Sequence, residues 1–394
     1  MTSDWTTIRA ADFIDFNPRL SIKKGTVATK IAMDKLKPFT KRIPETEKTE
    51  FSGGSKFSNG DTIMARITPC LENGKTAFVD VLEEGEIAFG STEFIVMRAR
   101  ENISDPQFIY YLATSPMFRN IAIKSMVGSS GRQRVQQGVL DELMLPVPSL
   151  DEQKRIGSFL AKLDEKIALN EQINDNLEQQ AHSYFQELFV DNADPEWTTG
   201  TISDLGAVVG GSTPSKAKPE YYTESGIAWI TPKDLSVNKS KFISHGENDI
   251  TELGLKNSSA SIMPEGTVLF SSRAPIGYIA IAAGEVTTNQ GFKSVIPKSE
   301  IGTPFVYFFL KHNLPVIEGM ASGSTFKEVS GSTMKNIPAV IPDAETLARF
   351  NDFCAPIFVQ QRILEEQSQS LAALRDNLLP KLMSGEIDVS DIQL

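Results

Sequence analysis

The chain has 394 residues, of which 40% are hydrophobic and 23% charged, enough for roughly two or three domains that each bury a core. No apolar stretch approaches the ~20 residues of a membrane helix, and the N-terminal residues lack the pattern of a secretory signal. Two cysteines, Cys70 and Cys354, exclude a disulfide framework, and three separate histidines argue against a histidine metal site. We therefore expect a cytoplasmic protein with no membrane partner, no metal and no cofactor.

The net charge of −11 is unevenly distributed along the chain. The whole acidic excess lies in residues 151–195 and 343–394, whereas the two longer segments are close to neutral. A nucleic-acid face on the longer segments is compatible with this charge pattern but is not indicated by it.

Strands and a helix are expected in the first 150 residues. Short apolar runs at 63–67, 87–89 and 94–97 predict strands. The first follows a turn at Gly60, and the last two are expected to form a strand pair split by Gly90. Residues 108–118 predict a helix, with Pro106 near its start.

A long helix is expected from residue 149 onward. Ser149 and Glu152 fit a capping box, in which each side chain would bond the other residue's backbone N–H. Beyond it, residues with alternating spacings of four and three form a heptad seam with two asparagine layers. The seam consists of Ile156, Leu160, Leu163, Ile167, Asn170, Asn174, Leu177, Ala181, Tyr184 and Leu188.

A similar order of elements is expected in the second half. Residues 268–271, after a turn at Gly266, predict a strand, and residues 304–311 predict a helix. Asp343 is interpreted as the N-cap of a second long helix rather than as part of a nuclease motif, which would need a following lysine. Pro356 predicts a kink or a break near the start of that helix. Its seam consists of Phe350, Cys354, Ile357, Gln361, Leu364, Ser368, Leu371, Arg375, Leu378 and Leu382.

The two halves are copies of one unit. Residues 4–7 (DWTT) recur as residues 196–199 (EWTT) at an offset of 192, and four further pairs share an offset of 194. These pairs are Met126 and Met320, Pro148 and Pro342, Arg155 and Arg349, and Phe159 and Phe353. Each long helix has a single apolar stripe, so it must pack on a partner. A homodimeric coiled coil is one solution, but the repeat favours pairing within the chain.

We therefore expect an α+β fold with a pseudo-two-fold internal repeat. Two globular domains, residues 1–148 and 191–342, would be joined by two long antiparallel helices, residues 149–190 and 343–394. No catalytic motif is found: Gly74-Lys75-Thr76 lacks the glycine five residues earlier that a phosphate-binding loop needs. Gly210-Gly211-Ser212 also lies outside any dinucleotide-binding pattern.

The second globular segment contains an ordered series of motifs. They are GGSTPSK at 210–216, IAWITPKDL at 227–235, SRAPIG at 272–277, TNQGF at 288–292 and GSTFKE at 323–328. This series resembles the specificity subunit of type I restriction–modification systems. The first segment resembles a different branch of the same domain through residues 59–66, 73–75 and 128–133, and the chain end at 378–387 is similar too.

The resemblance implies a non-catalytic protein that reads DNA. Each globular part would be a target recognition domain that reads one half of a bipartite site in double-stranded DNA. The helices would set the unread spacer and dock two methyltransferase subunits, with restriction and translocase subunits joining through them. Methylation and cleavage would belong to these partners. The alternatives are an adaptor without its own DNA reading and an enzyme, such as a nuclease, with an unrecognised site.

DNA contacts are expected at two loops rich in glycine and serine and at several single residues, because basic and amide side chains suit phosphates and base edges. The loop residues are Ser129, Ser130, Arg132, Gln133 and Arg134 in the first half and Ser324, Thr325 and Lys327 in the second. The single residues are Arg66, Asn73, Lys75, Lys233, Arg273, Gln290 and Lys293. The alternative for each is a solvated surface side chain or a turn former. Trp5, Trp197 and Trp229 are expected in the core or against a helix rather than stacked on bases.

Overall fold

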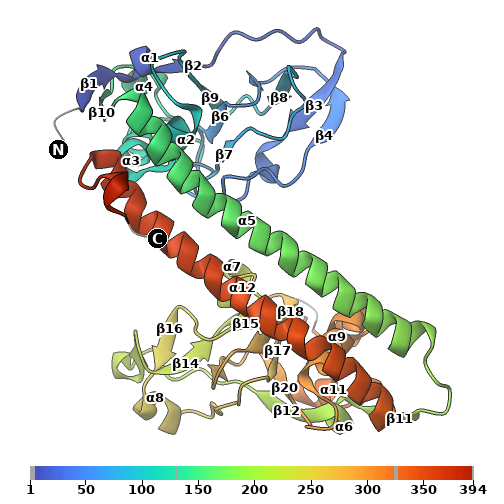
Figure 1. The fold of residues 1–394 in the computed structure, drawn as a ribbon. Helices are drawn as coiled ribbons and strands as arrows, with labels where there is room; N and C mark the ends of the chain where they lie inside the picture. Colours follow the sequence, from blue (N-terminus) through green and yellow to red (C-terminus); the bar gives the residue numbers. More distant parts are fainter. Residues whose placement is uncertain (1–4, 130, 324–326, 393–394) are drawn as a thin grey trace. The chain divides into compact units, whose positions relative to one another are not determined.

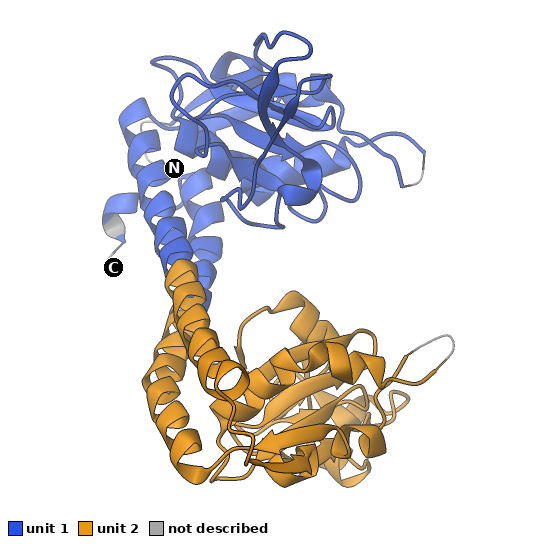
Figure 2. Ribbon diagram, turned by 90° about the vertical axis from the view of Figure 1, so that its right-hand side faces the viewer, with its two compact units in different colours: residues 1–169, 368–394 blue, residues 170–367 orange. Residues whose placement is uncertain are grey.

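The computed structural model describes residues 5–129, 131–323 and 327–392 (Figure 1). They form two compact units: unit 1 is Met1–Leu169 with Ser368–Leu394, and unit 2 is Asn170–Gln367 (Figure 2). Both units mix helices and strands, which confirms the mixture expected from the sequence. Within the described ranges, no helix is long and apolar enough to cross a membrane.

Unit 1 is built on short strands. These are β1 (Thr6–Arg9), β2 (Ile14–Phe16), β3 (Val27–Ile31), β4 (Glu47–Glu50), β5 (Lys56–Phe57), β6 (Thr62–Ala65), β7 (Thr76–Phe78), β8 (Ala88–Gly90), β9 (Phe94–Ala99) and β10 (Met144–Val147). Its helices are α1 (Ala10–Phe13), η1 (Met33–Lys35), α2 (Pro106–Thr114), α3 (Pro116–Lys124), α4 (Gln137–Asp141), η4 (Val389–Asp391) and parts of α5 (Leu150–Gln186) and α12 (Ala344–Ser384). The described strands form sheets of order β1-β10, β2-β9-β6-β7 and β4-β3-β8-β5.

The β2-β9-β6-β7 sheet of unit 1 is buried on both faces. On β6, Ile63 packs into the core shared with the β4-β3-β8-β5 sheet, whereas the next residue, Met64, packs into the core shared with α2. Val96 and Ile95 of β9 divide in the same way, because successive side chains of a strand point to opposite faces. A strand covered on both faces reads as a continuous apolar run, which is why these runs predicted strands correctly.

The predicted pairing of residues 87–89 with 94–97 is wrong. The corresponding strands β8 and β9 belong to different sheets, since β8 pairs with β3 and β5 whereas β9 pairs with β2 and β6. Gly90 makes this possible: a Cβ there would lie 2.4 Å from the carbonyl oxygen of Ile31, so only glycine allows β8 this close to β3.

The predicted helix at 108–118 is two helices, α2 and α3. Ser115 lies between them in an extended conformation, with φ −63° and ψ 148°. Pro116 imposes this conformation, because a residue before proline is disfavoured in the helical region. The Ser115 side chain then accepts a hydrogen bond from the Phe118 N–H at 3.5 Å and caps α3.

Unit 2 repeats this plan with different strands. They are β11 (Thr198–Thr201), β12 (Gly206–Gly210), β13 (Tyr222–Thr223), β14 (Ile227–Ile230), β15 (Phe242–Ile243), β16 (Asn248–Ile250), β17 (Val268–Ser272), β18 (Ile276–Ala282), β19 (Thr287–Thr288), β20 (Lys293–Pro297) and β21 (Pro338–Ile341). Its shorter helices are η2 (Glu187–Asp191), α6 (Ile202–Leu205), η3 (Pro219–Tyr221), α7 (Pro232–Val237), α8 (Glu252–Lys256), α9 (Thr303–His312), α10 (Leu314–Gly319) and α11 (Gly331–Lys335). The described strands form sheets of order β11-β21, β12-β20-β17-β18-β15 and β13-β16-β14-β19.

The repeat is visible in corresponding elements. In unit 1, β1 pairs antiparallel with β10 and leads into α1 and β2; in unit 2, β11 pairs antiparallel with β21 and leads into α6 and β12. The central strand β17 is covered on both faces, as β6 is. Phe270 packs with α9, whereas Leu269 packs into the core shared with the smaller sheet.

Both long helices begin at the predicted caps. The Ser149 hydroxyl accepts from the Glu152 N–H at 3.4 Å, and Asp343 Oδ1 accepts from the Thr346 N–H at 2.8 Å. The reciprocal half of the predicted capping box is wrong, because the Glu152 carboxylate pairs with Arg155 instead. Helices α5 and α12 have 37 and 41 residues.

The seam residues of both helices are buried or half-buried in each unit. In unit 1, Leu160 of α5 and Leu382 of α12 belong to one core with Phe108 of α2. In unit 2, Phe185 of α5 and Phe350 of α12 belong to one core with Phe308 of α9. Each globular part therefore packs on segments from both long helices.

Of the kink or break predicted at Pro356, the break does not occur, because α12 continues through the proline. Pro356 is exposed, and so is Asp352, whose carbonyl group loses its helical hydrogen-bond donor at the proline. Water can solvate that carbonyl group, and neighbouring seam residues such as Cys354 and Ile357 are buried in the core of unit 2. Packing of the apolar face thus holds the helix together across the proline.

The three tryptophans pack within the units, as expected. Trp229 is buried, and its indole N–H donates to the Ser212 carbonyl oxygen at 3.0 Å. The Trp197 indole N–H donates to the carboxylate of the N-cap Asp343 at 3.0 Å, and the Trp5 ring lies against Gly385.

Replacing Pro356 with alanine is expected to stabilise unit 2. The change restores one helical hydrogen bond and removes the steric conflict of the ring, a gain of about 2 kcal/mol after the greater freedom of the unfolded chain is subtracted. Chemical denaturation measures this, with Gln360→Ala, an exposed substitution one turn away, as a control expected to change stability by less than ~0.5 kcal/mol. A loss of stability in Pro356→Ala would contradict the account given for this helix.

Candidate nucleic-acid interface

In unit 1 the predicted contact loop is closed by a short antiparallel bridge. The backbones of Val127 and Arg134 exchange hydrogen bonds of 2.9 and 3.0 Å. Between them, Ser129 and Arg132 are exposed, and the Arg132 N–H donates to the Ser129 carbonyl oxygen at 3.0 Å. Ser130 lies outside the described residues. The loop therefore presents the Arg132 side chain to solvent.

The base of this loop is tied to the β2-β9-β6-β7 sheet. The Gln133 backbone exchanges hydrogen bonds with Thr68, and the Val135 N–H donates to the Arg66 carbonyl oxygen at 2.9 Å. The Arg66 side chain is half-buried and donates to the Val135 carbonyl oxygen at 3.2 Å. Arg66 thus lies beside the loop, but its guanidinium group is turned toward the loop backbone.

Arg134 is paired with an acid that the sequence did not indicate. Its guanidinium group donates to the Glu93 carboxylate through Nε, at 2.9 and 3.0 Å, and through Nη2, at 2.6 Å. These hydrogen bonds lower the pKa of Glu93. Glu93 directly precedes β9 and is 41 residues away from Arg134 in the chain, so no local pattern revealed the pair.

The other two predicted residues of unit 1 are placed differently. Asn73 is exposed in the turn before β7. Lys75 is half-buried, and its ammonium group donates to the Met33 carbonyl oxygen at 2.9 Å. The structure thus groups Arg66, Arg132, Gln133 and Arg134, and it directs Lys75 toward Met33.

In unit 2 the corresponding loop is also closed by an antiparallel bridge, between Ser322 and Glu328, with hydrogen bonds of 2.9 and 3.1 Å. Ser324 and Thr325 lie outside the described residues. Lys327 is exposed and lines a cavity of about 600 Å³ together with Arg273, Glu318 and Glu328. Arg273 Nη1 lies 3.3 Å from the Glu328 carboxylate.

The remaining predicted residues of unit 2 lie near the turn before β20. Lys293 is half-buried, its ammonium group is 3.8 Å from the Glu328 carboxylate, and burial lowers its pKa. Gln290 accepts a hydrogen bond from the Thr213 hydroxyl group. Lys233 is the second residue of α7 and pairs with Glu247 at 2.5 Å. The structure thus brings Arg273, Lys293 and Lys327 together around Glu328.

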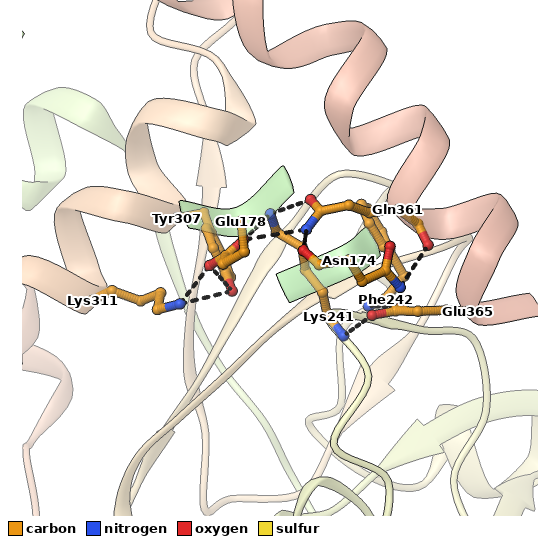
Figure 3. Close-up of polar contacts among 8 residues, drawn as sticks. All are labelled: Asn174, Glu178, Lys241, Phe242, Tyr307, Lys311, Gln361 and Glu365. Carbon is orange, nitrogen blue, oxygen red and sulfur yellow. Dashed lines mark hydrogen bonds and ion pairs between the residues drawn. The ribbon is translucent and has the colours of Figure 1, made fainter. Parts of the chain in front are cut away.

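A buried polar cluster joins the globular part of unit 2 to both long helices (Figure 3). Lys241, just before β15, donates from its ammonium group to Glu178 of α5 at 2.7 Å and to Gln361 of α12 at 2.8 Å. The backbone N–H groups of Lys241 and Phe242 donate to the Glu365 carboxylate at 2.7 and 3.0 Å. The Lys241 side chain and the backbone at the start of the edge strand β15 therefore form hydrogen bonds with both α5 and α12.

The charges of this cluster compensate one another. The Lys241 ammonium group lies 3.6 Å from the ring centroid of Phe358, and burial lowers its pKa to about 8. Burial alone would raise the pKa of Glu178, but the charges of Lys241 and Lys311 outweigh it and lower that pKa to about 2. Tyr307 of α9 also donates to Glu178, at 3.2 Å. At neutral pH, Glu178 is therefore ionised and Lys241 is mostly protonated.

Unit 1 has a smaller cluster of the same kind. The Tyr111 hydroxyl group of α2 donates to Asp164 of α5 at 2.5 Å, and Arg375 of α12 pairs with the same carboxylate at 2.5 Å. The sequence placed Arg375 in the seam but gave no indication of its partner, because the two residues are far apart in the chain. No cluster of histidine, cysteine or acidic residues that suits a metal ion is found within the part of the chain that the structure describes.

Comparison with known families adds a second line of evidence. The sequence model of the family described as "Type I restriction modification DNA specificity domain" matches residues 2–179 and again residues 195–381. The two matches coincide with the two copies found in the sequence, and together they cover most of the chain.

Individual proteins are similar as well. The "Type I restriction enzyme MjaIX specificity subunit" of Methanocaldococcus jannaschii is 40% identical over 191 residues, covering 46% of this chain and 44% of that protein. The HindI specificity subunit of Haemophilus influenzae is 25% identical over 410 residues, covering 84% of this chain and 87% of that protein. The chain thus matches less than half the length of the first relative.

A solved structure shares the fold. The type I restriction–modification S subunit from M. genitalium has a TM-score of 0.62 and 17% sequence identity, with 97% of both chains covered.

Glu178→Gln is expected to destabilise unit 2 at neutral pH. The folded-state pKa of Glu178 is about 2, below the ordinary value of 4.5, so its contribution is complete above pH 4.5 and is lost as the pH falls toward 2. Removing this charge leaves Lys241 buried without its anion, at a cost of roughly 3 kcal/mol. Denaturation from pH 7 to 3 is therefore expected to show a gap between wild type and variant that narrows below pH 4.5.

The control for this experiment is Glu252→Gln, which removes the acid of an exposed pair with Lys256 at 3.4 Å. This change is expected to cost less than ~0.5 kcal/mol at every pH. A pH-independent gap for Glu178→Gln would show that Glu178 stabilises the unit through packing rather than charge.

Proposed function

Because the chain belongs to the family of type I restriction modification DNA specificity domains, we propose that it is the DNA-reading subunit of such a system. Each globular part acts as a target recognition domain for one half of a bipartite site in double-stranded DNA. The chain catalyses no step itself, since the named relatives are specificity subunits and methylation and cleavage belong to partner subunits.

The observation that carries this proposal is the presence, in each matched copy, of a loop closed on a sheet with basic residues in the loop and beside it. Arg132 and Lys327 are exposed, and Arg134, Arg273 and Lys293 lie beside them. Guanidinium, ammonium and amide groups bind phosphates and the major-groove edge of guanine. We propose that the predicted contact residues in and around these loops bind DNA, and that Lys75 supports the fold.

The long helices have a different role. We propose that α5 and α12 pair antiparallel as a coiled-coil spacer, over 149–190 and 343–394, between recognition domains at 1–148 and 191–342. Their acidic excess suits protein partners better than DNA. The proposed partners are two methyltransferase subunits that dock on the helices, with restriction and translocase subunits joining through them.

Loss of an adenine mark at one bipartite motif is the expected result when this gene is deleted from cells that keep the methyltransferase partner. Single-molecule methylome sequencing measures this and supplies the target sequence. The complex reconstituted with its methyltransferase subunits is then expected to prefer that target over non-target DNA at 0.1–0.2 M salt. No preference would contradict the proposal and leave the adaptor role.

Arg132→Ala and Lys327→Ala are each expected to weaken binding of the complex to its target. Each removes a cation from an exposed position in a loop, so the slope of log K against log salt is expected to become shallower by about 0.9 if that cation contacts a phosphate. Lys256→Ala, in an exposed pair on α8, is the matched control. If both loop variants bind like the control, these residues do not contact DNA.

A further inference from the structure

The basic residues at the base of each loop are held by a carboxylate. In unit 1, the Glu93 carboxylate accepts three hydrogen bonds of 2.6 to 3.0 Å from Arg134, and the Glu93 side chain is 23% exposed. In unit 2, the Glu328 carboxylate lies 3.3 Å from Arg273 and 3.8 Å from Lys293. A carboxylate therefore offsets part of the positive charge at each loop: Glu93 pairs with Arg134, and Glu328 lies beside both Arg273 and Lys293.

The repeat shows that the positions of the cation and the acid are exchanged between the two copies. An offset of 194 aligns Arg134 with Glu328, and each begins the strand-like return from its loop. The following residues, Val135 and Val329, donate N–H bonds to Arg66 and Ser272 at the same point of the two central sheets. The loop side thus carries the cation in unit 1 and the anion in unit 2.

Because these positions are exchanged between the copies, the property that they share is the contact between a cation and a carboxylate, not the position of the cation. If only the individual cation mattered for binding phosphate, neither copy would need an acid beside it, because a carboxylate repels phosphate oxygens. When an acid holds a cation at a binding surface, a ligand must break their hydrogen bonds to reach the cation. Binding is therefore weakened for every ligand that does not offer the cation equivalent hydrogen bonds. Non-target DNA offers phosphates in any register, whereas the target also offers base edges that pair with the freed donors.

We propose that Glu93 and Glu328 are specificity-determining residues that weaken binding to non-target DNA by holding Arg134, Arg273 and Lys293. This proposal rests on the proposed function. It adds that two acidic residues at the DNA-binding loops disfavour non-target DNA. The cavity of about 600 Å³ beside Glu328 is lined by Arg273 and Lys327, so it leaves room for the Arg273 side chain to move away from Glu328.

The test uses the complete complex with Glu93→Gln and Glu328→Gln, which keep the shape and a hydrogen-bond acceptor but remove the charge. Each freed cation that reaches a phosphate is expected to steepen the slope of log K against log salt by about 0.9. At 0.15 M salt this corresponds to about fivefold tighter non-target binding per cation, and up to about 30-fold for the two cations beside Glu328. Target affinity is expected to rise less, so the ratio of target to non-target affinity falls.

Glu45→Gln and Glu252→Gln are the controls, because each removes the acid of an exposed pair, with Lys35 and Lys256, and changes the net charge equally. The double variant Glu93→Gln/Arg134→Ala is expected to lose the gain seen in Glu93→Gln. The proposal is overturned if both single variants match the controls, or if they lose target affinity without gaining non-target affinity, while the wild type discriminates. Failure of the wild type to discriminate would instead remove the proposed function on which this inference rests.

Discussion

The structure depends on burial of the single apolar stripe of each long helix. A helix of 37 or 41 residues with one such stripe is not stable in water by itself. In each unit the stripe is completed by a globular part: Phe108 of α2 covers it in unit 1, and Phe308 of α9 covers it in unit 2. Truncating a buried phenylalanine of this kind typically costs about 3–5 kcal/mol, so the cores bind helices and globular parts into single folding units.

Buried charges add directionality that apolar packing lacks. Apolar surfaces tolerate sliding, whereas Lys241 can satisfy Glu178 and Gln361 at the same time in only one placement. In unit 1, the ion pair between Asp164 and Arg375 likewise fixes the placement of α5 against α12. For a protein proposed to read DNA, such fixed placement is useful, because base edges are recognised only within a few tenths of an ångström of the right geometry.

The features that the sequence predicted well are local or periodic. The caps at Ser149 and Asp343 depend on residues three positions apart, and both long helices follow from spacings of three and four. Some of the errors have local causes, such as the split of the predicted helix at Pro116 and the pairing of Glu152 with Arg155, but others came from contacts between distant residues. The strand partners of β8, the break expected at Pro356, and the acid that holds Arg134 are all decided by packing that no local pattern encodes. Lys75 was predicted as a single DNA-contact residue beside a turn, yet its ammonium group donates to the Met33 carbonyl oxygen.

If the chain reads DNA as proposed, its charges act both at long range, through the net charge of whole segments, and at short range, through ion pairs at the loops. The helical segments carry the acidic excess of the chain, so at long range they repel DNA. The globular parts are near neutral overall, and Arg134 and Arg273 beside the loops are paired with acids. Long-range attraction to DNA is therefore weak, and binding energy must come from contacts made at the loops. Under the proposed function, general DNA affinity then comes from the partner subunits, and this chain contributes mainly the discrimination between sequences.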